Sequence, residues 1–347
     1  MGVSKRRHRE ARCPLCGAGE ARHLVTKRGC EVVRCRDCSL VFVWPQPTPE
    51  ELDALYSAGN YHAALDEGER RRYFARRLRE IEAVLASRRP GEAEPRTTRT
   101  RDEDEDEDDR KPTRLLDVGC SMGHLLEVAK ASGWEAVGVE VNRNAVEAAR
   151  ARGLDVCLGD LADQAFAEAS FDLVTLLDVL EHSRDPRALL AACHRVLRPG
   201  GLLVVTTPDI GGLVPRLTWR LFGATIGAWE HPTPPGHLVQ FSRRTLRRLL
   251  DESGFQVVAE RSEHIPVAYS VGKLENSIID VLAGRHRERP PAGDGGGLSR
   301  VTRHASRIRG LPRLGVRALC WAVLGVAGLA ARLLRCGDSR WVAACRR

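Results

Sequence analysis

The chain has 347 residues, of which 43% are apolar, so it can bury a full core and form two globular units with some linker. Its formal net charge of +8 comes almost entirely from one stretch, because residues Arg285 to Arg317 contain nine arginines and two acids, a local excess of seven. The net charge therefore does not by itself indicate a nucleic-acid partner for the rest of the chain. The basic N-terminal residues precede no apolar run, which argues against a secretory signal peptide and favours a cytoplasmic protein.

Two Cys-x-x-Cys pairs stand near the N-terminus and are separated by 18 residues. They comprise Cys13, Cys16, Cys35 and Cys38. This spacing is typical of a zinc ribbon, and four thiolates complete a tetrahedral Zn²⁺ site, so we predict structural Zn²⁺ at residues 1–48. The nearby cations lack interleaved aromatic residues, which makes nucleic-acid binding by this module a secondary interpretation.

Composition divides the rest of the chain into four parts. Residues 49–87 have a helical pattern and are predicted to lie on the substrate side, and residues 88–112 contain a run of eight acids. Such a run repels itself and buries nothing, so we expect a disordered linker, with an acidic segment for a basic partner as the alternative. Residues 113–262 form the main α/β domain, and residues 263–347 form a basic and apolar helical insertion with a final strand.

Short apolar runs alternate with helical patterns through the main domain. We predict strands at 114–118, 135–140, 154–158, 171–177, 201–207 and 255–260, and helices at 123–132, 144–152, 186–197 and 243–253. A turn at Arg198-Pro199-Gly200-Gly201 is expected to open the fifth strand. The pattern predicts a parallel sheet covered by helices, which binds ligands at the carboxyl ends of its strands.

Three successive strand ends carry glycines and acids. Asp117-x-Gly119-x-x-x-Gly123 follows the first strand, and its glycines permit a tight turn and a close backbone approach to a ligand. Glu140 ends the second strand, 23 positions beyond Asp117, close to the spacing at which an acid binds ribose hydroxyls. Asp160 follows the third strand and could accept from an adenine amino group, while Leu161 packs on the ring.

These motifs resemble those of the class I S-adenosylmethionine-dependent methyltransferases, and in particular the ubiquinone-pathway O-methyltransferases. The resemblance covers residues 115–260 and rests on Leu116-Asp117-Val118-Gly119-Cys120, Gly138-Val139-Glu140, Gly159-Asp160, Phe171-Asp172-Leu173-Val174, Glu181-His182, Leu197-Arg198-Pro199-Gly200-Gly201, His237-Leu238, Phe241-Ser242, Thr245-Leu246 and Gly254-Phe255. It implies a Rossmann-like seven-stranded methyltransferase sheet that binds S-adenosyl-L-methionine, and residues 340–345 could form the seventh, antiparallel strand that closes the family's sheet. The implied cofactor residues are Asp117, Gly119, Cys120, Ser121, Gly123, Glu140, Asp160, Leu161 and Asp178, and Ser121 departs from the family's frequent middle glycine.

Two other interpretations of this loop remain. A nicotinamide-dependent enzyme requires a Gly-x-Gly pair, which the loop lacks, and Asp117 does not suit a pyrophosphate. A sheet of this type that binds no cofactor is the second alternative. An acidic loop suits S-adenosyl-L-methionine better than a nicotinamide cofactor, because S-adenosyl-L-methionine has no phosphate and carries an amine and a sulfonium.

Histidines are the candidates for catalysis, because an acceptor hydroxyl must lose a proton during methyl transfer. His182 follows the fourth strand at the predicted mouth of the site, although it could instead cap the next helix or brace the loop. His231 and His237 lie in the segment Trp229–His237, which is rich in Pro and Gly and sits where the family places its substrate lid, and they are alternative bases.

The zinc module together with the sheet resembles a subset of methyltransferases of sugar, polysaccharide and antibiotic pathways. That resemblance adds Tyr61 and His62 as secondary site candidates. Near the C-terminus, residues 318–331 are uncharged and lie between Arg317 and Arg332. Fourteen residues are short of the roughly 20 that span a bilayer, so the segment suits either an interfacial helix on anionic lipid or a helix packed on the protein.

The sequence thus predicts a methyltransferase acting on a small-molecule, sugar or lipid-linked glycan acceptor, by O- or C-methylation. An RNA or protein methyltransferase and a non-catalytic zinc-containing binding protein are the alternatives. We expect a cytoplasmic protein with peripheral membrane contact through residues 285–335, and nucleic acid is not the favoured partner.

Overall fold

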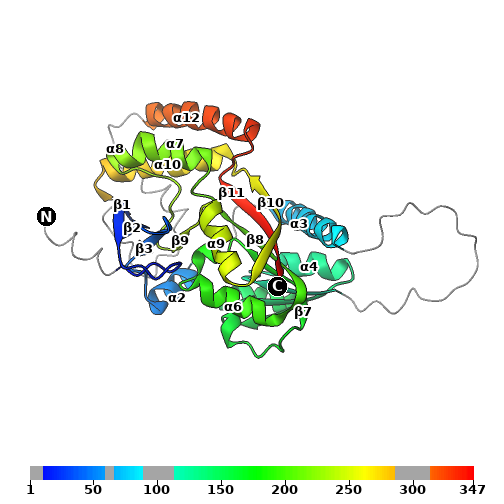
Figure 1. Cartoon of the computed structure of the whole chain (residues 1–347). Helices are drawn as coiled ribbons and strands as arrows, with labels where there is room; N and C mark the ends of the chain where they lie inside the picture. The colour runs from blue at the N-terminus through cyan, green and yellow to red at the C-terminus, as the bar shows by residue number, and fades with distance from the viewer. Residues whose placement is uncertain (1–10, 59–65, 89–112, 286–312) are drawn as a thin grey trace, which may run out of the picture.

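The computed structural model describes residues 11–58, 66–88, 113–285 and 313–347. It contains a seven-stranded sheet, a four-stranded sheet built on the N-terminal module, and a layer of helices at one side (Figure 1). The acidic run and the candidates Tyr61 and His62 lie outside the described residues.

The large sheet has the strand order β10-β11-β8-β7-β4-β5-β6. Its strands are β4 (Arg114–Val118), β5 (Glu135–Glu140), β6 (Asp155–Leu158), β7 (Phe171–Leu177), β8 (Leu197–Pro208), β10 (Phe255–Glu263) and β11 (Ser339–Arg346). Strands β4 to β8 run parallel, and β11 is antiparallel to both of its neighbours. The predicted seven-stranded sheet with a closing antiparallel strand is confirmed.

Helices cover both faces of this sheet because neighbouring strand residues alternate between two apolar clusters. Leu115 packs with α3 (Glu67–Ser87), α4 (His124–Ala131) and α5 (Arg143–Ala151). Leu116 packs on the opposite face with α6 (Pro186–Val196) and α9 (Arg243–Glu252). Side chains at Asp66, Asn142, Asp185 and Ser242 accept hydrogen bonds from the first turns of α3, α5, α6 and α9, which fixes where these helices begin.

The turn predicted before the fifth strand lies inside that strand. Leu197 pairs with Phe171 and Leu202 pairs with Leu173, so residues 198–201 stand opposite a single residue of β7. Gly200 has a φ of +76°, which lets the chain form this bulge. Strand β8 therefore begins at Leu197, earlier than the sequence predicted, because pairing resumes on both sides of the turn.

The second sheet has the order β1-β2-β3-β9 and is antiparallel. It comprises β1 (Ala21–Lys27), β2 (Cys30–Cys35), β3 (Val41–Trp44) and β9 (Val239–Gln240). Strand β9 follows the predicted lid, about 200 residues after β3 in the chain, and no sequence pattern indicated its pairing. The N-terminal Cys-rich module and the strand that directly follows the lid therefore share one sheet.

The third part is a helical layer with its own apolar core. It consists of α7 (Leu213–Thr218), the π-helical η3 (Trp219–Gly223), α8 (Ala224–Ile226), α10 (Val267–Leu282) and α12 (Arg313–Leu333). Leu274 and Ile278 of α10 pack there with Leu324 and Ala327 of α12. The predicted helix at 318–331 is the central part of α12, whereas α7 and α10 were not predicted. The short α2 (Pro49–Ala58) follows the ribbon.

Candidate functional site

The loop between β4 and α4 needs its glycines. Gly119 has a φ of +71°, and a Cβ atom there would lie 2.5 Å from Cγ2 of Val179. Gly123 has a φ of +80°, and a Cβ atom there would lie 2.4 Å from Cδ1 of Leu154. A side chain at either position would clash. The glycines therefore let the backbone turn in close contact with Val179 and Leu154.

Ser121 and Glu140 are joined across the loop. The Ser121 N–H donates to Oε2 of Glu140 at 2.8 Å, and the Asn142 N–H donates to Oε1 at the same distance. Ser121 adopts a φ of +53°, so it takes the left-handed conformation expected of the family's middle glycine. The carboxylate keeps lone pairs for further donors and is held at the carboxyl end of β5, where ribose hydroxyls could reach it.

Asp117 lies inside the sheet. Its side chain is buried, and its Oδ1 accepts from Oγ1 of Thr175 on β7 at 2.6 Å. Burial raises the pKa of this carboxyl to about 7. Asp117 thus braces β4 against β7 directly beneath the glycine loop, and Thr175 is a partner that the sequence did not indicate.

The remaining predicted cofactor residues surround the same strand ends. Cys120 and Leu161 are buried, and Asp160 is exposed just before the short helix η1 (Leu161–Asp163). Asp178, with a φ of +56°, follows β7, and its Oδ1 accepts from Oγ1 of Thr206 at 3.1 Å. These positions meet at the point where the chain switches from one side of β4 to the other, which is where open α/β sheets bind ligands.

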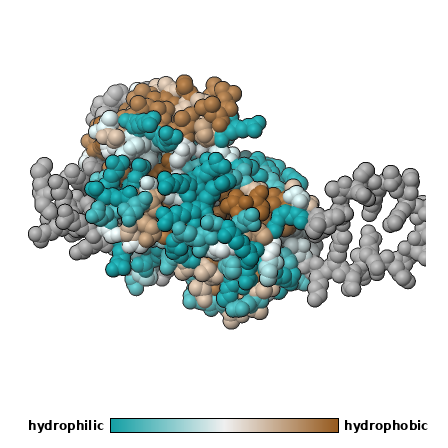
Figure 2. Space-filling model, viewed as in Figure 1, coloured by the Kyte–Doolittle hydropathy of each residue, from teal (hydrophilic) through white to brown (hydrophobic). Residues whose placement is uncertain are grey.

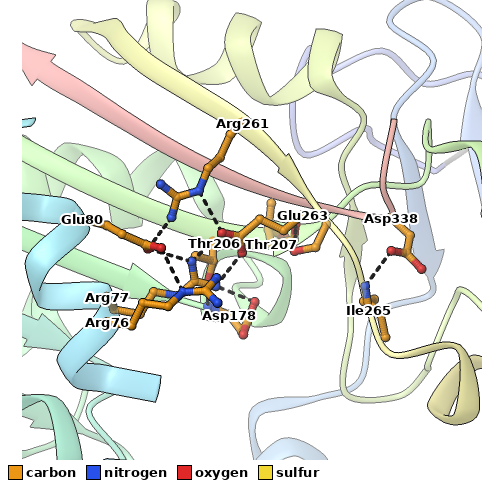
Figure 3. A network of polar contacts seen from close by, with 11 residues as sticks. Arg76, Arg77, Glu80, Asp178, Thr206, Thr207, Arg261, Glu263, Ile265 and Asp338 are labelled. Atoms are coloured by element: carbon orange, nitrogen blue, oxygen red, sulfur yellow. Dashed lines mark hydrogen bonds and ion pairs between the residues drawn. The ribbon is translucent and has the colours of Figure 1, made fainter. Parts of the chain in front are cut away.

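An ion-pair network beside Asp178 was missed by sequence reasoning. Arg77 of α3 donates twice to Glu263 of β10, each time at 2.5 Å, and also contacts Glu80 (Figure 3). Arg261 completes the network with Glu80 and Glu263. Because the Arg77 side chain is almost fully buried, this network fixes α3 over the edge of the site. No local motif distinguishes these residues from surface charges.

Two of the three histidine candidates are adjacent. The rings of His182, in the short helix η2 (Leu180–His182), and His237 have centroids 4.7 Å apart. Nδ1 of His182 lies 3.0 Å from the carbonyl oxygen of Gly236, an acceptor, so Nδ1 carries the proton and Nε2 the lone pair. Burial lowers the pKa of His182 to about 4 and that of His237 well below its usual range, so both rings are neutral at pH 7.

Glu181 lies beneath this pair. Its Oε2 accepts from Oγ1 of Thr207 at 2.9 Å, and its burial raises the pKa of the carboxyl well above the usual range. One ligand-type atom from each of Glu181, His182 and His237 falls within 4.8 Å of the others, a donor set that could also hold a divalent cation. The sequence indicated Glu181 through the Glu-His pair but assigned it no role.

The lid that carries His231 is fastened to its surroundings. Lys27 of the ribbon donates from Nζ to the carbonyl oxygens of Trp229 (2.7 Å) and Pro232 (2.9 Å). The Leu238 N–H donates to the Glu181 carbonyl at 2.8 Å, which ties the end of the lid to η2. His231 is buried, and burial together with nearby lysines lowers its pKa to about 3. Nothing in the sequence around Lys27 indicated this link.

The four predicted zinc ligands come together. Sγ of Cys13 lies 3.5 Å from Sγ of Cys38, Sγ of Cys16 lies 3.6 Å from Sγ of Cys35, and all four sulfur atoms lie within 4.8 Å of one another. Tetrahedral Zn–S bonds of about 2.3 Å place thiolates roughly 3.8 Å apart, so the cluster fits Zn²⁺. Cys30 is buried outside this group, as expected of a packed thiol.

Comparison with known proteins agrees with this geometry. The sequence profile of a methyltransferase domain matches residues 70–260, more than half of the chain. A ubiquinone biosynthesis O-methyltransferase of Idiomarina loihiensis is 37% identical over 103 residues, which cover 27% of this chain and 42% of that protein. A probable S-adenosylmethionine-dependent methyltransferase of Mycolicibacterium smegmatis is 30% identical over 145 residues, 41% of this chain and 52% of that protein.

The chain thus spans about half the length of the curated relatives that it matches. A solved structure of a SAM dependent methyltransferase from Archaeoglobus fulgidus is similar with a TM-score of 0.44 and 15% identity, over 79% of this chain and 94% of that chain, too weakly to inform the site. The profile match, the strand order and the glycine loop agree, and the chain belongs to the family of class I S-adenosylmethionine-dependent methyltransferase domains.

Proposed function

We propose that the protein transfers the methyl group of S-adenosyl-L-methionine to a small-molecule acceptor. The observation that carries this proposal is the hydrogen bond from the Ser121 N–H to Glu140, which links the glycine loop to a carboxylate at the adjacent strand end. The cofactor residues would be Gly119, Ser121 and Glu140 around the adenosine, with the exposed Asp160 beyond them.

The bound cofactor supplies a methyl group that its sulfonium already activates, so the chain's own task is alignment and proton removal. The neutral ring of His182 is suited to accept a proton from an acceptor hydroxyl at Nε2, because the Gly236 carbonyl orients the ring through Nδ1. His237 packs against this ring, and its burial favours a supporting role beside His182. The lid, which carries His237, would exclude water from the reacting groups.

Support for a small acceptor comes from the relatives and from the distribution of charge. Several relatives are named ubiquinone biosynthesis O-methyltransferases, which suggests a hydroxyl acceptor of modest size. The excess of arginines falls at 285–317, away from the glycine loop in the sequence, which disfavours RNA. The zinc ribbon favours a sugar or a lipid-linked glycan within this class, and cytoplasmic action is part of the proposal.

A direct test has two stages. Calorimetry with purified full-length protein should show binding of S-adenosyl-L-methionine, and the product S-adenosylhomocysteine should compete. Labelled methyl donor is then incubated with catechols and quinols, sugar nucleotides, lipid extract, RNA and protein. Transfer to a small molecule supports the proposal, and transfer to RNA or protein alone contradicts its acceptor class. Binding without transfer to any class indicates a non-catalytic protein, and absence of binding rejects the proposal entirely.

A further inference from the structure

Exposed apolar side chains gather on the helical layer. Twelve large apolar side chains are exposed among the described residues, and ten of them belong to η3, α8, α10, α12 or the residue after α12. Six lie in α12 or directly after it: Leu319, Trp321, Val326, Leu329, Leu333 and Leu334. In Figure 2 brown, hydrophobic residues gather at the top of the view, where Figure 1 places α12. Soluble proteins seldom expose such a concentration, so this surface has a partner.

Helix α12 is apolar on two sides. Cys320, Leu324, Ala327 and Ala331 recur at helical spacing and are buried against the rest of the layer. The opposite side exposes Val326, at 73% of its surface. By length and composition alone the segment Gly315–Leu333 could cross a membrane. Its buried side instead packs along α10 and α7 (Figure 1). A partner would therefore contact the exposed side of α12 along its length.

Charge identifies the partner. Helix α12 contains Arg313, Arg317 and Arg332 and no acid, and Arg335 follows the helix. Arg317 precedes its uncharged stretch and Arg332 comes directly after it. An apolar strip with cations at its ends matches an acyl-chain boundary with anionic headgroups. A second copy of the chain would instead bring like charges together around the strip. The exposed Trp321 has the amphipathic ring that is enriched at bilayer interfaces.

We propose that the helical layer docks on an anionic lipid bilayer, with α12 lying in the plane of the interface. The layer also adjoins the lid, because Oγ of Ser277 in α10 accepts from the Trp229 N–H at 3.1 Å. Docking therefore brings the lid close to the membrane, where an acceptor held in lipid could reach it. The proposal concerns binding and holds whether or not the acceptor of methyl transfer is a small molecule.

The test is co-sedimentation of the full-length protein with vesicles. Vesicles of equal parts phosphatidylcholine and phosphatidylglycerol should bind the wild type, and vesicles of phosphatidylcholine alone should bind it at least about tenfold less. The double variant Val326→Glu with Leu329→Glu should lose binding to the anionic vesicles by about tenfold or more. The single variant Val326→Glu should also weaken binding, and Val258→Glu is its matched control, because it adds the same single charge at an exposed apolar site on β10, outside the layer.

Circular dichroism should confirm that all variants are folded, as expected for changes at exposed positions. Equal binding by the wild type and the double variant would overturn the proposal, and so would no binding by the wild type. Light scattering tests the alternative partner, a second copy of the chain. A dimeric wild type together with a monomeric double variant would assign the surface to a second copy and contradict docking on lipid. Cofactor binding is measured on the same samples, so failure of docking is distinguishable from failure of the proposed methyltransferase activity.

Discussion

The Nζ atom of Lys27 lies 2.7 Å from the carbonyl oxygen of Trp229, and this contact joins the zinc-ribbon module to the lid more than 200 residues away in the chain. The same ammonium reaches the Pro232 carbonyl. Burial lowers the pKa of Lys27 to about 7, because few polar groups replace the water around it. The ribbon therefore helps to set the position of the loop that carries His231.

Lys27→Met should loosen this loop. The substitution keeps most of the apolar stem of the side chain but leaves two carbonyl groups without their donor, so we expect the free energy of unfolding to fall by about 2 kcal/mol. Lys130→Met is the control, because Nζ of Lys130 donates to the Gly153 carbonyl at an exposed site, and its loss should cost less than about 0.5 kcal/mol. Denaturant titration measures both, and equal losses would contradict a special role for Lys27.

Cys16→Ser should remove the metal. The variant lacks one of the four thiolates that the tetrahedral site needs, so mass spectrometry under native conditions should show a chain without bound zinc, whereas the wild type should carry one ion. Cys30→Ala changes a buried thiol of the same module outside the cluster and should keep its zinc. Retention of zinc by Cys16→Ser would show that the four sulfur atoms do not act together.

Glu140→Ala should weaken cofactor binding. It removes the acceptor that holds the Ser121 and Asn142 N–H groups, and with it the acceptor for ribose hydroxyls, so the Kd for S-adenosyl-L-methionine should rise by about tenfold or more. Glu135→Ala, at the other end of β5, removes an exposed carboxylate paired with Arg114 and should leave the Kd unchanged. An unchanged Kd in Glu140→Ala would place the cofactor elsewhere.

His182→Ala should lower turnover without changing cofactor affinity. Proton removal by a positioned base typically accelerates a reaction by about 10² to 10⁴, so we expect kcat to fall by about a hundredfold with a hydroxyl acceptor. His194→Ala is the matched control, because this histidine of α6 packs against Phe255 of β10, outside the pair formed by His182 and His237. Wild-type kcat in His182→Ala would exclude this histidine from the reaction.

Glu230→Gln should change how stability depends on pH. Burial raises the pKa of Glu230 to about 7 from an ordinary value of 4.5, and its Oε1 accepts from Thr218. A raised pKa in the folded state gives stability that is fully present below pH 4.5 and is lost as the pH rises through 7. Between pH 5 and pH 8, the wild type should therefore lose about 2 kcal/mol of unfolding free energy relative to Glu230→Gln.

The exposed Glu168→Gln provides the comparison for that experiment, and its stability should follow the wild type across the same pH range. Urea titration at each pH gives the free energies. A difference between wild type and Glu230→Gln that does not change with pH would show that Glu230 ionises in the folded protein as it does in water.

The sequence determined the features whose information is local. Periodicity and strand-end motifs predicted the parallel sheet and the glycine loop, because a buried strand and a tight turn leave their signatures within a few residues, and the family resemblance added the closing antiparallel strand. The spacing of Cys13, Cys16, Cys35 and Cys38 predicted the metal cluster for the same reason. The roles of His182, His231 and His237 stay predictions.

Contacts between distant segments were decided by the tertiary structure. The pairing of β9 with β3, the contact of Lys27 with the lid and the Arg77–Glu263 ion pair each join residues 186 or more positions apart. A single lysine, a two-residue strand or an isolated acid carries no local pattern that specifies its partner. Only the packing of the whole chain brings these partners together. Local sequence patterns therefore specified the cofactor-binding sheet, whereas contacts between distant segments fixed the position of the lid and its surroundings.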